Sequence, residues 1–290
     1  MPSRVLSIGD PFRYALFLAA LLGGAGCGSN NGTNGGSTST GSGGSTGSAG
    51  TGGLPYSGEV SMVHSGVTGG SFYISAGFSP TMAAGAPCAG GPQVGSCCYQ
   101  GPSDGGSSPA PTAESAGPVA INDGSSALAT LTFTDAGSYS VASSGQLAWT
   151  SGDTLSVSAA GATVDEFSGS ITVPNAVSGL SPALSSSSPP GVPVSMDLHV
   201  SWTPDTTAGE SFDIALIDGA KGVIHCYTTD AAASLTVSSS LLSHFSSGDS
   251  VTLGVARSGA ATPTCANASV QLTAEATSSR FRRGTPRTSS

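Results

Sequence analysis

The chain has 290 residues and a formal net charge of −9, and only 9% of its residues are charged. Residues 28–279 hold 16 acidic side chains but only two basic ones, Lys221 and Arg257. Because nucleic-acid phosphates require a basic surface, this balance argues against a nucleic-acid partner. Many short β-branched and aliphatic runs between turn residues argue against intrinsic disorder and predict an all-β fold.

Residues 1–26 have the layout of a signal peptide. Arg4 and Arg13 precede the apolar run 14–22, and small residues then lead to Cys27. This order resembles the lipobox of bacterial lipoproteins, in which the cysteine is lipidated and becomes the mature N-terminus. The resemblance implies a lipid anchor on Cys27. The alternatives are ordinary secretion and a membrane-spanning anchor, although the apolar run is shorter than the about 20 residues that spanning requires.

The residues after Cys27 bear on where the anchor would place the protein. Gly28 follows the cysteine, so no Asp stands there to retain the protein at the inner membrane. By the same resemblance, to envelope lipoproteins of Gram-negative bacteria, this implies the outer membrane. Residues 27–55 are rich in Gly, Ser and Thr, and a random coil of this length reaches about 26 to 32 Å. We therefore expect a tether that holds a folded body away from a membrane.

Residues 56–184 predict a β-rich subdomain. Apolar and polar residues alternate with the period of two that strands show, and the expected strands are 58–62, 71–78, 127–134, 154–159 and 168–173. Residues 79–118 are rich in Gly, Pro and Ser and carry Cys88, Cys97 and Cys98. We expect this stretch to be a loop constrained by its own disulfide.

The stretch 185–193 is the expected internal boundary, and residues 185–276 predict an Ig-like or fibronectin-like β-sandwich. Trp202 is its expected core aromatic residue, and Asp218-Gly219 predicts a hairpin turn. Residues 239–245 predict a short helical turn, and 277–290 predict a basic disordered tail. The expected strands are 197–203, 211–217, 223–227, 234–237, 250–256 and 269–274.

The whole arrangement resembles a family of predicted lipoproteins of unknown function that is abundant in myxobacteria. Its members share a Gly-Cys lipobox, a Gly/Ser/Thr linker and a β-rich body. The segments that carry the comparison are Leu155-Ser-Val-Ser-Ala-Ala-Gly161, Phe167-Ser-Gly-Ser-Ile-Thr-Val-Pro174 and Asp197-Leu-His-Val-Ser-Trp202. These motifs mark strands and turns, so the resemblance implies a fold and a location but no activity.

The cysteines beyond Cys27 indicate an oxidising compartment. Five remain, so at least one thiol has no partner within the chain. Their spacing suggests a pair between Cys226 and Cys265, and a pair between Cys88 and either Cys97 or Cys98. Zinc is the alternative for the Cys88, Cys97 and Cys98 group, but no nearby His completes a tetrahedral set, so we expect a disulfide and no cofactor.

Patterns that would indicate an enzyme are weak. Ser45 and Ser103 fit G-x-S-x-G, but neither lies on the strand-to-helix turn that a nucleophile requires. The four histidines are scattered, with His199 and His225 expected to face solvent. The adjacent pair Asp165-Glu166 indicates a turn rather than a glycosidase site.

Calcium is the open alternative among ligands, because oxygen-rich acidic loops suit this ion. The candidate groups are the Asp-Gly loops, which are also the usual composition of a hairpin turn, and a group formed by Asp205, Glu210 and Asp213. The sequence predicts a non-enzymatic binding or structural module whose partner is an envelope protein or a polysaccharide. The alternative is a surface-attached hydrolase with a site assembled from distant residues.

Overall fold

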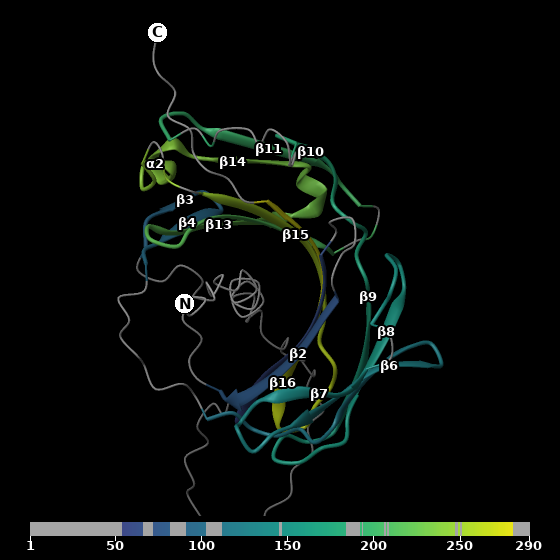
Figure 1. The fold of residues 1–290 in the computed structure, drawn as a ribbon. Helices are drawn as coiled ribbons and strands as arrows, with labels where there is room; N and C mark the ends of the chain where they lie inside the picture. The colour runs from purple at the N-terminus through teal and green to yellow at the C-terminus, as the bar shows by residue number, and fades with distance from the viewer. Residues whose placement is uncertain are drawn as a thin grey trace, which may run out of the picture.

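The computed structural model describes residues 54–65, 72–81, 91–102, 112–144, 147–183, 192, 194–205, 207, 209–246, 249 and 251–280. Within these ranges the chain is nearly all β, in three sheets, which confirms the all-β sandwich (Figure 1). The predicted signal peptide, Cys27, Cys88, Ser45, Ser103 and the chain after Arg280 lie outside the described residues. No helix in the described part of the chain is long and apolar enough to cross a membrane.

The largest sheet has eight strands. All of its pairings are antiparallel except that of the first and last strands of the chain, β1 and β16, which run parallel. In spatial order the strands are β2 (Phe72–Pro80), β1 (Tyr56–Ser65), β16 (Ala268–Arg280), β15 (Thr252–Ala261), β12 (Ser211–Asp218), β13 (Gly222–Thr229), β4 (Cys97–Gln100) and β3 (Gln93–Val94).

Two smaller sheets complete the fold. The five-stranded sheet has the order β7 (Tyr139–Ser144), β6 (Ser126–Phe133), β5 (Val119–Asp123), β8 (Thr154–Ala159) and β9 (Phe167–Thr172). The three-stranded sheet has the order β10 (Ser178–Ser181), β11 (Leu198–Thr203) and β14 (Ser234–Val237). A 3-10 turn, η1 (Asp230–Ala232), and one short helix, α2 (Ser239–Leu242), join strands of the second half.

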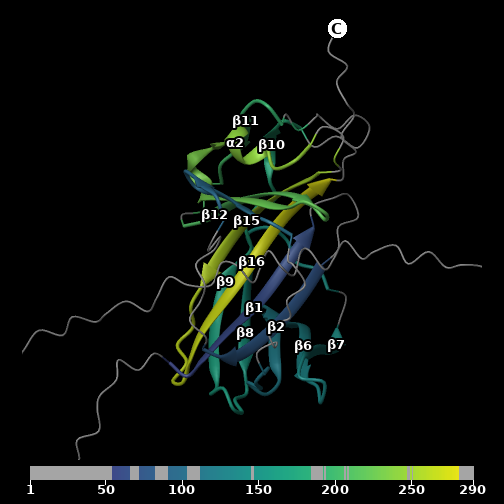
Figure 2. The same cartoon turned by 90° about the vertical axis from the view of Figure 1, so that its left-hand side faces the viewer.

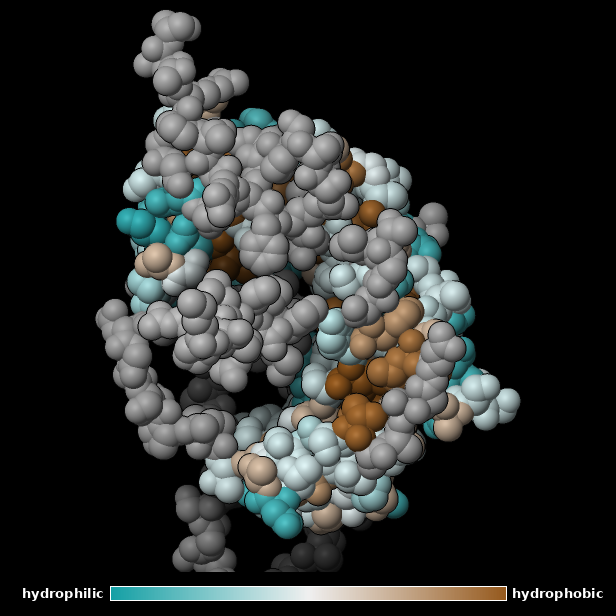
Figure 3. All heavy atoms as spheres, viewed as in Figure 1, coloured by the Kyte–Doolittle hydropathy of each residue, from teal (hydrophilic) through white to brown (hydrophobic). Residues whose placement is uncertain are grey.

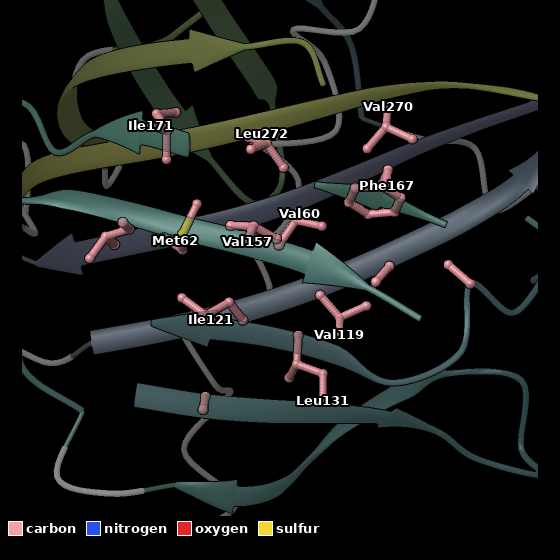
Figure 4. Packing of buried hydrophobic residues seen from close by; sticks show 14 of the residues in the cluster. Val60, Met62, Val119, Ile121, Leu131, Val157, Phe167, Ile171, Val270 and Leu272 are labelled. Carbon is pink, nitrogen blue, oxygen red and sulfur yellow. The ribbon is translucent and has the colours of Figure 1, made fainter. Parts of the chain in front are cut away.

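The eight-stranded sheet is bent, and both smaller sheets lie against its outer side (Figures 1 and 2). The five-stranded sheet packs on the β2, β1 and β16 end, where alternating residues such as Val60, Met62 and Leu272 meet Val157 and Ile121 (Figure 4). The three-stranded sheet and α2 pack on the β15, β12 and β13 end, forming a second apolar core. Since the core residues occupy alternate positions along each strand, only one side of the large sheet is used in these cores.

The two cores differ in how completely their apolar side chains are covered. In the second core Trp202 of β11 stacks on Phe212 of β12 with ring centroids 3.8 Å apart, so the prediction that Trp202 is a core aromatic is confirmed. In the first core, hydrophobic surface gathers where β2 and the five-stranded sheet meet, at the lower right of Figure 3. Partly buried side chains of this core include Phe72, Ile74 and Leu147. Its edge is therefore less completely covered than its centre.

The large sheet crosses the boundary that the sequence predicted at 185–193. Strands β1, β2, β3 and β4 from the first part complete the sheet formed by β12, β13, β15 and β16. The strands after 185 thus do not make a sandwich by themselves, because four of the eight strands of their main sheet come from residues 56–100.

Most predicted strands are found, with small shifts at their ends, and the helical turn near 239 is present. The stretch 79–118 is not the plain loop that was predicted, because β3 and β4 lie within it and pair beside β13. The predicted tail also begins too early. Residues 277–280 continue β16 and pair with β15, which extends their ladder to Arg280.

The predicted pair Cys226–Cys265 is wrong. Cys226 forms a disulfide with Cys97, its direct cross-strand neighbour, with the two Cα atoms 4.0 Å apart. Cys265 has a free thiol and packs against the first core, whereas Cys226 belongs to the second. Cys98 is disulfide-bonded as well. The predicted alternative of a bond between Cys88 and Cys97 is therefore also wrong, whereas the expected unpaired thiol is present at Cys265.

Candidate functional site: the polar face of the large sheet

The side of the eight-stranded sheet that faces away from the two smaller sheets carries most of its polar side chains. We call it the polar face. It follows from strict alternation, since the residues between the core positions of each strand must point to the other side. Its central members are Glu59 and Ser61 of β1, Thr273 and Glu275 of β16, Ala256 and Ser258 of β15, Asp213 and Ala215 of β12, and His225 and Tyr227 of β13.

The strand register places the carboxyl groups of the polar face along a line that runs diagonally across the strands. Glu275 lies opposite Ser258 of β15, and Asp213 lies opposite Ala256 of the same strand. Only small side chains of β15 therefore stand between the two carboxyl groups. On the other side of β16, Glu59 accepts a hydrogen bond of 2.8 Å from the Thr273 hydroxyl.

These carboxyl groups are shielded from water, and their pKa values respond. Burial raises the pKa of Glu59 to about 7, although the Thr273 hydrogen bond opposes this. Burial and then repulsion from Glu59 raise the pKa of Glu275 to about 7. Burial and then repulsion from Glu275 raise the pKa of Asp213 to about 8, against the effect of the Ile214 backbone amide. At neutral pH this face therefore holds protons that exposed carboxylates would have lost.

Strand β13 adds two rings to the same face. Burial lowers the pKa of His225 to about 4, so its imidazole is neutral at pH 7. Burial and then the charge of Asp213 raise the pKa of Tyr227, so its phenol keeps its proton. The two rings stack with centroids 5.9 Å apart. The expectation that His225 faces solvent is wrong, because the residue is only 5% exposed, with Ala215 of β12 and Cys98 of β4 as its cross-strand neighbours.

Three buried polar atoms on this face have no hydrogen-bond partner in the described structure: Ser61 Oγ, Asp213 Oδ1 and His225 Nδ1. Their residues are 3%, 5% and 5% exposed. A buried polar atom without a partner costs about 1–3 kcal/mol, so native structures usually supply one from a ligand, an ion or water.

The only buried cation among the described residues lies on the other side of the sheet. Arg257 of β15 is 1% exposed, and its Nε donates to Asp230 Oδ1 at 2.9 Å and lies 3.6 Å from Glu210 Oε2. Its remaining N–H groups donate to three backbone carbonyls, those of Asn175, Ala176 and Thr203. Arg257 therefore ties the connection between β9 and β10, the end of β11 and η1 to the large sheet.

The acidic group proposed for calcium is divided between the two faces. Asp205 and Glu210 lie with Asp230 around Arg257, whereas Asp213 is on the polar face. Burial, followed by the charge of Asp205, raises the pKa of Glu210 to about 7 against the attraction of Arg257. No group of three His, Cys, Asp or Glu in the described ranges could hold a metal ion. The Asp218 carboxylate caps the predicted hairpin turn by accepting from the Ala220 and Lys221 amides.

The other histidines are apart from this face. His199 is exposed, as predicted, and pairs with the Thr236 hydroxyl at 2.9 Å. His64 stacks on Phe72, and His244 stacks on Tyr99 at 3.8 Å. The Asp165 amide is bonded to Asn267 in a loop beside Cys265. Of the described residues that the sequence analysis weighed for catalysis, only His225 joins the polar face.

Sequence reasoning missed Glu59 and Glu275 altogether. The available signal was a glutamate within each of two segments in which apolar and polar residues alternate. Each glutamate stands at a position whose side chain points away from the apolar side of its strand. What the sequence did not contain was the parallel pairing of β1 with β16, which brings together residues more than 200 positions apart.

Comparison with known proteins adds no further assignment. No protein-family model matches the chain, and neither the curated proteins nor the solved structures contain a match.

The raised pKa values predict an unusual pH dependence of stability. Between pH 6.5 and 8.5 the folded protein binds more protons at Asp213, Glu275, Glu59 and Glu210 than the unfolded chain does, so stability falls as pH rises. His225 has the opposite effect only below pH 6.5. We expect the free energy of unfolding, measured in urea, to be lower at pH 8.5 than at 6.5.

A matched pair of variants checks the cause of this fall. Asp213→Asn keeps the shape and removes the titration, so it should reduce the slope by up to about 1.4 kcal/mol per pH unit and stabilise the protein at pH 8.5. Asp135→Asn, at an exposed turn, should change neither the slope of stability with pH nor the stability at pH 8.5. A slope unaffected by Asp213→Asn would contradict the assignment.

Proposed function

We propose that this protein is a binding module of the bacterial cell envelope, anchored by lipid on Cys27 and carried on the linker 27–55. It recognises its partner, an envelope protein or a polysaccharide, through the polar face of the large sheet. The observation that carries the proposal is the placement of both smaller sheets on one side of the large sheet (Figure 1). The opposite side concentrates titratable groups and unpartnered polar atoms that neither core requires.

The residue order of the N-terminus supports the anchor. A signal-peptide layout ending at a cysteine, followed by a Gly/Ser/Thr tether, suits a domain that works at a distance from a membrane. Mass spectrometry of the mature N-terminus checks it. A diacylglycerol-modified Cys27 is the expected result, and an unmodified N-terminus would contradict it.

A hydrolase is the second candidate, and one observation favours it. Glu59, Glu275 and Asp213 have pKa values near neutrality, which suits a general acid, and they lie on one face with His225. An enzyme would lose turnover without losing affinity when one of these carboxyl groups becomes an amide. A binding module would lose affinity.

Retention of envelope material by the immobilised full chain tests the proposed function. The variant Asp213→Asn with Glu275→Gln removes two carboxyl groups from the polar face, and Asp123→Asn with Asp135→Asn removes two from the five-stranded sheet and its adjoining turn. We expect the first variant to lose most of the retained partner and the second to retain it. Equal retention by both would contradict the polar face as the binding surface.

A further inference from the structure

The unpartnered atoms of the polar face share one property, which is that all three can accept a hydrogen bond. The Asp213 carboxylate oxygen is an acceptor, the neutral imidazole of His225 has one acceptor nitrogen, and the Ser61 hydroxyl can accept through its lone pairs. A ligand that carries several N–H or O–H donors would therefore satisfy all three. The carboxyl groups beside them favour a donor with positive charge.

The spacing of the acidic groups distinguishes between kinds of cation. Glu59, Glu275 and Asp213 lie on three different strands, β1, β16 and β12, and no three ligating side chains in the described structure approach closely enough to enclose a metal ion. A compact ion could thus engage only one or two of them. A chain with positive charges at intervals could engage each in turn, lying over the small side chains of Ala256 and Ser258.

Burial limits the width of the ligand. Ser61, Asp213, His225 and Glu275 are each 5% exposed or less, so the flat surface of a folded partner could not reach them, whereas an extended segment of a partner or a slender molecule could. A slender molecule is the class that fits.

From the unpartnered acceptors, the diagonal of carboxyl groups and their burial, we propose that the polar face binds a linear polyamine, with its ammonium groups on Glu59, Glu275 and Asp213. This inference rests on the proposed function, because it places a small cationic ligand on the same face that binds the envelope partner. Ammonium N–H donors on this diagonal would satisfy Asp213 Oδ1, the carboxyl oxygen that has no partner.

Proton release should accompany binding, because the carboxyl groups must ionise to pair with ammonium. Six titratable groups lie on this face: Glu59 of β1, Glu275 of β16, Asp213 of β12, His225 and Tyr227 of β13, and Tyr73 of β2. The described strands β15, β4 and β3 add no other titratable group to it. Burial raises the pKa values of Glu59 and Glu275 to about 7 and that of Asp213 to about 8. Affinity should therefore rise between pH 6 and pH 8.

Titration calorimetry of the full chain with spermidine, and separately with Ca²⁺, tests the proposal. We expect saturable spermidine binding that weakens roughly tenfold or more in Asp213→Asn and in Glu275→Gln, since each loses a charge-assisted hydrogen bond. The exposed Asp135→Asn variant should bind like the wild type. Far-ultraviolet circular dichroism of each variant checks that the fold is intact.

Three results would overturn the inference: no spermidine binding by the folded wild type, binding unaffected by both polar-face variants, or Ca²⁺ binding at the same residues in preference to spermidine. Failure of the ligand class is distinguishable from failure of the proposed function. If spermidine does not bind but the polar-face variant still loses envelope partners that the Asp123/Asp135 variant retains, the surface stands and the ligand class is wrong. If neither spermidine binding nor the retention of envelope partners changes in the polar-face variant, both the ligand class and the binding surface are wrong.

Discussion

Replacing Arg257 by Met is expected to destabilise the protein by about 3 to 5 kcal/mol, the usual effect of removing one partner from a buried ion pair. The substitution leaves Asp230 and Glu210 buried without their cation and removes the donors to three carbonyls. Because these contacts join segments from both smaller sheets to β15, unfolding should remain cooperative but occur at much lower urea concentration.

The matched control is Lys221→Met, which removes the same charge from an exposed hairpin turn. We expect it to change the free energy of unfolding by less than about 0.5 kcal/mol, as surface substitutions usually do. Adding Asp230→Asn to Arg257→Met should recover part of the loss, because it removes one uncompensated charge. Similar effects from Arg257→Met and Lys221→Met would show that the buried network does not hold the sheets together.

The second large effect is expected from the disulfide between Cys97 and Cys226. It closes a loop with a sequence separation of 129, for which the chain-entropy relation gives a stabilisation of about 5 kcal/mol. The bonded Cys98 next to it already restricts the unfolded chain, so a loss of about 2 to 4 kcal/mol is expected for Cys97→Ala with Cys226→Ala. Urea unfolding under non-reducing conditions measures it.

Cys265→Ala is the control for this pair, because its thiol is free and partly exposed. It should destabilise the protein by less than about 1 kcal/mol, and β4 should remain paired with β13 in it. If Cys265→Ala proved as damaging as the double replacement, the observed connectivity would be incorrect.

Local patterns in the sequence were sufficient for most strands. β8 and β14 have the predicted bounds, because their alternation is regular and turn residues limit both ends. β4 could not be predicted in the same way. Its four residues stand in a stretch rich in Gly and Pro, and the ladders with β13 and β3 and the bond to Cys226 make them a strand.

The candidate site was harder to predict than the strands, because it depends on which strands are neighbours. Placing residues 185–276 in a separate sandwich led to the wrong partner for Cys226, since that division excluded β4 from the sheet. It also left Glu59 and Glu275 in different domains. Only the parallel pairing of β1 with β16 brings these residues to one face, and no local periodicity encodes that pairing.

Photo-crosslinking from the polar face tests the central claim most directly. A photoreactive residue at Tyr73, which is 37% exposed on β2, reports on this face, and one at Met196, 61% exposed before β11, reports on the three-stranded sheet. In intact cells that express the full chain, the account predicts a mass-shifted adduct from position 73 and none from position 196. An adduct formed only from position 196 would contradict it.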